Sequence, residues 1–143
     1  MKLYLESLGC DKNRVDSEKL LSELLDKYSG SEVTSDPAEA DIAIVNTCSF
    51  IGPAKEESIN TILDLAEYKK SGKLQKLIVA GCLVERYKDE IRKELPEIDE
   101  IASVKDYVRR LDGQMKRVES GDKFTRYLKI AEGCDKYCSY CII

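Results

Sequence analysis

Residues 42–48 read Ile-Ala-Ile-Val-Asn-Thr-Cys and give the clearest indication of the fold class. Its apolar half, residues 42–45, has no polar alternation, which is typical of a strand buried on both faces of a parallel sheet. A second such run, residues 77–80, precedes Gly81-Cys82. Buried strands separated by longer amphipathic segments predict strand–helix–strand units and a parallel sheet.

The alternation of strands and helices extends in both directions from these two runs. Further strands are expected at residues 2–8, 33–34 and 98–102. A single turn is expected at Asp36-Pro37, and helices from Asp16 or Ser17 to Lys27, from Pro53 to about Lys70, from about Val84 to Leu95, and from Ser103 to Leu111. The sequence therefore predicts an α/β fold, specifically a flavodoxin-like parallel sheet with helices on both faces.

The pattern changes after residue 111, which we take as the end of the α/β domain, residues 1–111. Residues 112–125 contain Gly113 and Gly121 in a polar stretch without an apolar period, which predicts a linker. Residues 126–130 resemble one more strand, at the start of a second unit spanning residues 126–143. Because a strand without a partner is not a complete unit, we expect the chain to be part of a longer protein.

Composition limits the class of protein. Lys plus Arg number 23 and Asp plus Glu 27, which gives a net charge of −4 and argues against a protein that coats nucleic acid. No apolar run approaches the ~18 residues that span a bilayer. The first residues, Met-Lys-Leu-Tyr-Leu-Glu, lack the apolar stretch of a secretory signal. We expect a cytoplasmic globular protein.

The cysteines are the chemically informative residues. The chain has no histidine, which excludes histidine acid/base catalysis and His-ligated metal sites. Its six cysteines would suffice for three disulfides. In a protein without an export signal, however, cysteines are more typical of metal ligands or reactive thiols, and we keep a disulfide framework as the weaker alternative.

Cys10, Cys48 and Cys82 each end an apolar run and precede an expected helix. In open α/β sheets, ligands bind outside the carboxyl ends of the strands, and helix N-termini favour negative charge there. Three thiolates without histidine suit an iron–sulfur cluster with one open iron, whereas structural zinc normally takes four protein ligands. The plainer alternative is that these are small buried residues at tight turns.

Cys134, Cys138 and Cys141 form a C-x3-C-x2-C run. Such close spacing allows three thiolates to surround one cubane and leave its fourth iron free for an exogenous ligand. The alternatives are a zinc knuckle that borrows a fourth cysteine, and a redox pair formed by Cys138 and Cys141.

The C-x3-C-x2-C run, with Tyr140 before its last cysteine, resembles the signature of radical S-adenosylmethionine enzymes. With the three upstream cysteines, the chain is similar to the methylthiotransferases. Lys12-Asn13 after Gly9-Cys10 resembles the branch that modifies a ribosomal protein. The other matching stretches are Val15-Asp16-Ser17-Glu18, Asn46-Thr47-Cys48-Ser49-Phe50-Ile51, residues 54–58 and Gly81-Cys82-Leu83.

The resemblance implies two [4Fe–4S] clusters and S-adenosylmethionine as cofactors. Cys134, Cys138 and Cys141 would hold the cluster that cleaves S-adenosylmethionine to a radical, with Tyr140 near the adenine, at the start of a truncated radical enzyme barrel. The auxiliary cluster, on the ligands Cys10, Cys48 and Cys82, would carry or activate the sulfur. No residue of this chain is expected to be catalytic in its own right.

The resemblance also implies the substrate and the partners. The expected reaction is methylthiolation of an aspartate β-carbon in a small-subunit ribosomal protein, with flavodoxin or ferredoxin as electron donor and no membrane. This chain would supply the auxiliary-cluster domain and the first cluster-binding loop, and alone would be inactive. The alternatives are a tRNA adenosine methylthiotransferase of the same family, and an isolated cluster-binding or zinc-binding module without activity.

Overall fold

A computed structural model describes residues 1–103, 117–118, 120, 124–131 and 133–141. Five parallel strands form one sheet with the order β2-β1-β3-β4-β5. They are β1 (Lys2–Ser7), β2 (Glu32–Thr34), β3 (Ile42–Thr47), β4 (Lys76–Gly81) and β5 (Glu100–Ala102). This strand order is that of flavodoxin-like folds, so the expected fold class is confirmed.

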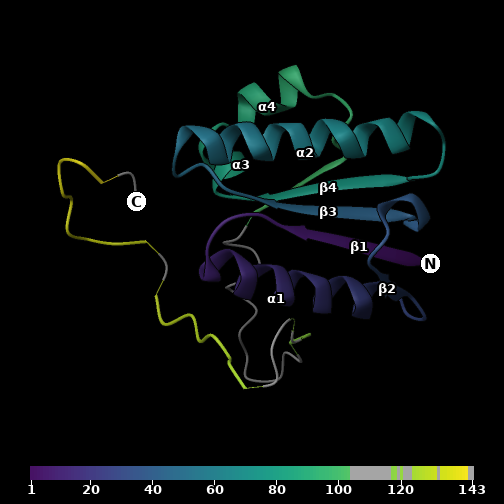
Figure 1. Cartoon of the computed structure of the whole chain (residues 1–143), viewed down its shortest axis with the longest axis horizontal. Coiled ribbons are helices and arrows are strands. Elements are labelled where there is room, and N and C mark those ends of the chain that lie inside the picture. Colours follow the sequence, from purple (N-terminus) through teal and green to yellow (C-terminus); the bar gives the residue numbers. More distant parts are fainter. Residues whose placement is uncertain (104–116, 119, 121–123, 132, 142–143) are drawn as a thin grey trace.

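Helices cover both faces of the sheet, as predicted (Figure 1). Helix α1 (Asp11–Lys27) lies on one face, and α2 (Gly52–Lys70), α3 (Cys82–Arg86) and α4 (Lys88–Glu94) lie on the other. The expected turn after Asp36 is the 3-10 turn η1 (Pro37–Glu39), which the Asp36 carboxylate caps by accepting a hydrogen bond from the amide of Ala38. No described helix is long and apolar enough to cross a membrane.

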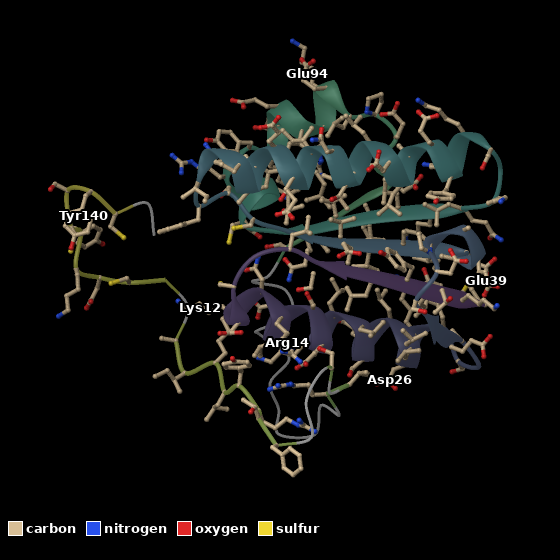
Figure 2. All side chains as sticks on the ribbon, viewed as in Figure 1. Lys12, Arg14, Asp26, Glu39, Glu94 and Tyr140 are labelled. Carbon is tan, nitrogen blue, oxygen red and sulfur yellow. The ribbon has the colours of Figure 1, made fainter. Side chains whose placement is uncertain are left out.

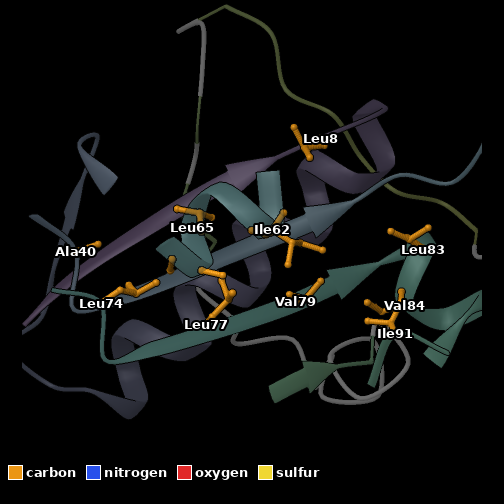
Figure 3. Close-up of a cluster of buried hydrophobic side chains, with 13 residues drawn as sticks. Leu8, Ala40, Ile62, Leu65, Leu74, Leu77, Val79, Leu83, Val84 and Ile91 are labelled. Atoms are coloured by element: carbon orange, nitrogen blue, oxygen red, sulfur yellow. The ribbon is translucent and has the colours of Figure 1, made fainter. Parts of the chain in front are cut away.

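The unbroken apolar run of β3 fills two separate cores. Because successive side chains of a strand point to opposite faces, Ala43 and Val45 pack into the cluster beneath α2, α3 and α4. Figure 3 shows this cluster, including Ile62 and Leu65 from α2. Ile42 and Ile44 point the other way, into the cluster beneath α1. Every residue of β3 is buried, which explains why its sequence lacks polar alternation.

Helix α1 begins at Asp11, earlier than the expected start at Asp16 or Ser17. Cys10 is the extended N-cap residue, and the first helical hydrogen bond runs from the amide of Arg14 to the carbonyl of Cys10 over 3.1 Å. The prediction missed this first turn because its inward residue, Asn13, is polar and buried, so the apolar period begins only at Val15.

One expected helix is divided in two. The segment predicted as a helix from Val84 to Leu95 breaks at Tyr87, whose backbone (φ −121°, ψ 32°) lies outside the helical region. The Tyr87 ring packs against the core, and its hydroxyl accepts a hydrogen bond from Lys55 Nζ at 3.1 Å. The break between α3 and α4 therefore coincides with the tertiary contacts of the Tyr87 ring.

Beyond β5, the expected strand at residues 126–130 is wrong. The structure assigns no helix or strand to the residues it describes between 117 and 141. The physical reason is that no described strand lies beside residues 126–130 to complete a ladder of hydrogen bonds. The expected helix from Ser103 to Leu111 and most of the expected linker at 112–125 lie outside the described residues.

Candidate metal centre

Cys10, Cys48 and Cys82 follow the C-terminal ends of three adjacent strands. The register pairs Ser7 of β1 with Asn46 of β3, and Thr47 of β3 with Gly81 of β4, so the three strand ends lie level at one edge of the sheet. Cys48 and Cys82 come directly after their strands, and Cys10 comes three residues after β1. The predicted placement of the cysteines at strand ends therefore holds.

Two glycines bring the cysteine loops close to one another. Gly9 has φ +110°, and a Cβ placed on it would lie 3.2 Å from the Sγ atom of Cys48. Gly81 has φ +95°, and a Cβ placed on it would lie 2.2 Å from Oδ1 of Asn46 and 2.4 Å from the carbonyl oxygen of Thr47. Only glycine combines these backbone angles with such close approach.

The buried side chain of Asn13 contacts the loops of all three cysteines. Its Nδ2 donates hydrogen bonds to the carbonyl oxygens of Leu8, over 3.0 Å, and Thr47, over 2.9 Å. These carbonyls lie just ahead of Cys10 and Cys48, respectively. On the other side of the amide, the Cys82 thiol donates to Oδ1 over 3.7 Å. One carboxamide thus holds the three loops in register, and we call it the Asn13 brace.

Buried polar groups support the Asn13 brace from beneath. Asn46 Nδ2 donates to the carbonyl oxygen of Asn13 over 2.7 Å and to Ser17 Oγ over 2.9 Å, and Ser17 donates to the same carbonyl over 2.8 Å. Asn46 Oδ1 is buried and accepts no hydrogen bond from any residue that the structure describes. Because buried polar atoms are almost always paired, plain core packing does not explain this oxygen beneath the cysteine loops.

Ser58 of α2 fixes the backbone of Cys48. Its hydroxyl accepts a hydrogen bond from the Cys48 amide over 3.0 Å and donates to the Cys48 carbonyl over 3.1 Å. Cys48 is buried, with only 9% of the residue exposed, whereas Cys10 and Cys82 are exposed. A group bound at this edge would therefore meet one recessed thiol and two open ones.

The residues fit a cluster by the chemistry of their donors. Three thiols from adjacent loops, in a chain without histidine, match the all-cysteine ligation of iron–sulfur clusters. Within the described ranges, no three His, Cys, Asp or Glu side chains stand close enough together to hold a single metal ion. The structure thus brings the three loops together, with Cys48 and Cys82 turned toward the Asn13 region, but it does not gather the sulfurs into one ligand group.

The second cysteine group lies on an exposed segment. Cys134, Cys138 and Cys141 are all exposed, and the amide of Cys141 donates to the carbonyl of Cys138 over 2.9 Å, which closes a turn between these two cysteines. Tyr137 has φ +49°, a left-handed conformation uncommon for a tyrosine. Figure 2 shows Tyr140 well away from the sheet, so the two cysteine groups stand apart.

Sequence reasoning assigned no role to Asn13, Asn46 or Ser58. A partial signal was present, because Asn46 interrupts the apolar run just before Cys48 and Asn13 comes three residues after Cys10. What the sequence did not contain was the contact between them, which joins segments 33 residues apart.

The model of the "Uncharacterized protein family UPF0004" matches residues 2–103, which include the whole sheet and the loops of Cys10, Cys48 and Cys82. The chain belongs to this family. The match covers the candidate metal centre and stops ahead of Cys134, so UPF0004 membership rests on the α/β domain.

Similar proteins carry a more specific name. This UPF0004 chain is 48% identical to a protein of Lachnoclostridium phytofermentans named "Ribosomal protein uS12 methylthiotransferase RimO", over 100% of this chain and 37% of the relative. Proteins of the same name from Solibacter usitatus and Geobacter sulfurreducens are 47% and 46% identical, over 34% and 36% of their length. The resemblance to methylthiotransferases is confirmed, and the chain spans little more than a third of these curated relatives.

Proposed function

We propose that this chain supplies the auxiliary-cluster domain and the first cluster-binding loop of a ribosomal-protein uS12 methylthiotransferase. The observation that carries the proposal is the Asn13 brace, which ties together the loops of Cys10, Cys48 and Cys82. A brace that serves three cysteine loops is unnecessary if each cysteine merely fills a turn. The names of the relatives support the activity and the substrate.

In this proposal Cys10, Cys48 and Cys82 are the protein ligands of the auxiliary [4Fe–4S] cluster. Three cysteine ligands leave one iron open, which suits a site that must carry or activate sulfur. Cys10 is the N-cap residue of α1 and no side chain caps that helix, so the unpaired amides of its first turn favour a negatively charged group beside Cys10.

Cys134, Cys138 and Cys141 are proposed to hold the second [4Fe–4S] cluster, with Tyr140 beside the adenine of S-adenosylmethionine. The turn that joins Cys138 to Cys141 supports this assignment, because it places two of the ligands on one compact loop. When bound, these cofactors supply the radical chemistry needed to functionalise an unactivated C–H bond, which protein side chains do not perform.

The proposed substrate is an aspartate β-carbon of ribosomal protein uS12, and the proposed electron donor is a flavodoxin or ferredoxin. We place the protein in the cytoplasm, where a reducing environment keeps thiols available for metal. The names of the relatives favour the ribosomal protein over tRNA adenosine, which the sequence alone left open.

The test uses the longer protein that contains this chain, reconstituted with iron and sulfide under anaerobic conditions. It is incubated with S-adenosylmethionine, a reductant and either uS12 or tRNA, and each product is analysed by mass spectrometry. We expect one methylthio group in place of one hydrogen on an aspartate of uS12. Methylthiolation of tRNA alone would assign the chain to the other branch, and modification of neither would overturn the proposed activity.

A further inference from the structure

Helix α1 also holds the chain segment that leads to the second cysteine group. We propose that Asp16 and Glu18 are positioning residues that clamp the described part of residues 117–129, namely 117–118, 120 and 124–129, onto α1. In Figure 1 the described residues that precede Cys134 pass on the α1 side of the molecule. Neither Asp16 nor Glu18 takes part in the Asn13 brace or in ligation by the cysteines, so the clamp gives these two residues a separate function.

The first half of the clamp is a buried ion pair. Lys129 Nζ lies 2.8 Å and 2.6 Å from the two carboxylate oxygens of Asp16. The side chains of Lys129 and Asp16 are only 5% and 10% exposed, respectively. Exposed ion pairs hold little in place, but a buried pair fixes both partners because neither charge is stable there alone.

The second half of the clamp surrounds Glu18, whose side chain is 2% exposed. One carboxylate oxygen accepts hydrogen bonds from the backbone amide of Ser120, over 2.8 Å, and from its hydroxyl, over 2.7 Å. The other oxygen pairs with the guanidinium of Arg117. These three donors come from the segment beyond the α/β domain, and α1 itself adds an ion pair from Arg14, whose Nε lies 3.6 Å from a Glu18 carboxylate oxygen. The segment therefore supplies the hydrogen bonds of the buried carboxylate.

The face of α1 that carries Glu18 makes further contacts with the segment. Arg14, Glu18 and Ser22 are spaced four residues apart and therefore lie on one helical face. Ser22 Oγ accepts a hydrogen bond from the amide of Val118 over 2.7 Å, and the Arg14 guanidinium lies 6.0 Å from the ring centre of Tyr127. A continuous face with complementary partners indicates a built docking site for this segment.

The clamp has a consequence for the two cysteine groups. Asp16 lies six residues after Cys10, and its partner Lys129 lies five residues before Cys134. The ion pair therefore fixes where the second group leaves the α/β domain relative to the first. This consequence rests on the proposed function, whereas the clamp itself depends only on contacts within the metal-free chain.

The Glu18 half is tested by amide hydrogen exchange of the metal-free chain, followed by NMR. In Glu18→Gln we expect the amide of Ser120 to exchange faster by roughly tenfold or more, since it loses a charged acceptor. The amide of Ile44 in the core should keep its rate, and Glu67→Gln, which breaks the exposed Lys70–Glu67 pair, should leave Ser120 unchanged. Equal acceleration of Ser120 and Ile44, or no acceleration of Ser120, would overturn the clamp.

The Asp16 half is tested by limited digestion with trypsin, which needs a free lysine side chain. In Asp16→Asn we expect cleavage after Lys129 to accelerate at least roughly tenfold, because the buried pair is lost. Cleavage after the exposed Lys136 serves as the internal reference, and Asp16→Glu should restore much of the protection. Cleavage after Lys129 as fast as after Lys136 in the unaltered chain would overturn the proposal. Neither test involves iron. These two tests therefore judge the clamp alone, and the methylthiolation assay judges the proposed function.

Discussion

The thiol of Cys82 donates a hydrogen bond to Oδ1 of Asn13 over 3.7 Å, so a residue of the first turn of α1 contacts the cysteine at the start of α3. The two residues are 69 positions apart in the sequence. Because Nδ2 of the same amide is committed to the carbonyls of Leu8 and Thr47, the orientation of the Asn13 side chain is fixed, with its oxygen toward Cys82. The site therefore depends on a carboxamide and not merely on a polar residue.

This dependence predicts that Asn13→Asp is severely damaging although the two side chains have the same shape. The carboxylate would face the carbonyls of Leu8 and Thr47 with acceptors in place of donors. We expect the free energy of unfolding, measured by urea denaturation, to fall by about 2–4 kcal/mol, since two buried acceptors lose their donors. Asn60 is exposed, so Asn60→Asp makes the same chemical change away from the Asn13 brace and is the matched control. Equal stability of the two variants would show that the Asn13 brace is not formed.

The close approach at Gly81 predicts a further difference between two glycine variants. Gly81 and Gly72 both have positive φ, +95° and +78°, so an alanine is strained at either position. Only at Gly81 would the new Cβ also meet Asn46 and Thr47, whereas it meets nothing within 4 Å at Gly72. We expect Gly81→Ala to lower the unfolding free energy by about 1–3 kcal/mol more than Gly72→Ala does. Similar losses in urea denaturation would mean that backbone strain alone accounts for both.

The clamp predicts that the protection of the Ser120 amide from hydrogen exchange depends on pH. Burial raises the pKa of Glu18, but hydrogen bonds from Ser120 and the charge of Arg117 outweigh it, so the pKa lies below its ordinary value of 4.5. Because docking lowers the pKa of Glu18, the ionised carboxylate stabilises the docked segment fully when the pH lies above the ordinary pKa. This stabilisation is lost as the pH falls through the lowered pKa of the folded state. The protection factor of the Ser120 amide should fall in this acid range in the unaltered chain. In Glu18→Gln it should be low and should show a much smaller acid step, since only the Asp16–Lys129 half of the clamp then remains to be lost in acid. An equal acid step in both proteins would exclude Glu18 as its origin.

The exposure of the cysteines predicts their order of alkylation in metal-free protein. Cys10 and Cys82 are exposed and Cys48 is buried, with both its backbone groups bonded to Ser58. Iodoacetamide should therefore modify Cys48 last among the three, as read by mass spectrometry of the peptides. Ser58→Ala removes the hydrogen bonds that hold the Cys48 backbone, so it should reduce the difference in modification rate between Cys48 and the two exposed cysteines. Modification of Cys48 as fast as Cys10 would contradict the recessed position of its thiol.

Much of the fold could be predicted from the sequence because its signals are local. The apolar runs that became β3 and β4 are buried on both faces, and no other element accommodates them so well. The start of α1 was missed because Asn13 serves the site and so breaks the apolar period there. Residues 126–130 have strand-like composition, which predicted a strand, but no described strand lies beside them to complete a ladder of hydrogen bonds.

The candidate site was predictable only in part for a related reason. The position of each cysteine after an apolar run is a local pattern, and the sheet brings those run ends together. The Asn13 brace, the support from Ser58 and the clamp on Glu18 join residues up to 102 positions apart. Such contacts depend on the tertiary fold, and the residue types involved are common on any protein surface.

A cluster at the three strand ends is tested most directly by the iron and sulfide content per chain after anaerobic reconstitution and desalting. One variant replaces Cys10, Cys48 and Cys82 with alanine, and its matched control replaces Cys134, Cys138 and Cys141. We predict about four irons with equal sulfide in the control, since one cubane fills one three-cysteine site. We predict nearly none in the first variant, because its remaining cysteines, Cys134, Cys138 and Cys141, are exposed and a cluster on them would be lost during desalting. Retention of most of the iron by the first variant, or zinc in place of iron in the unaltered chain, would contradict a cluster at the three strand ends.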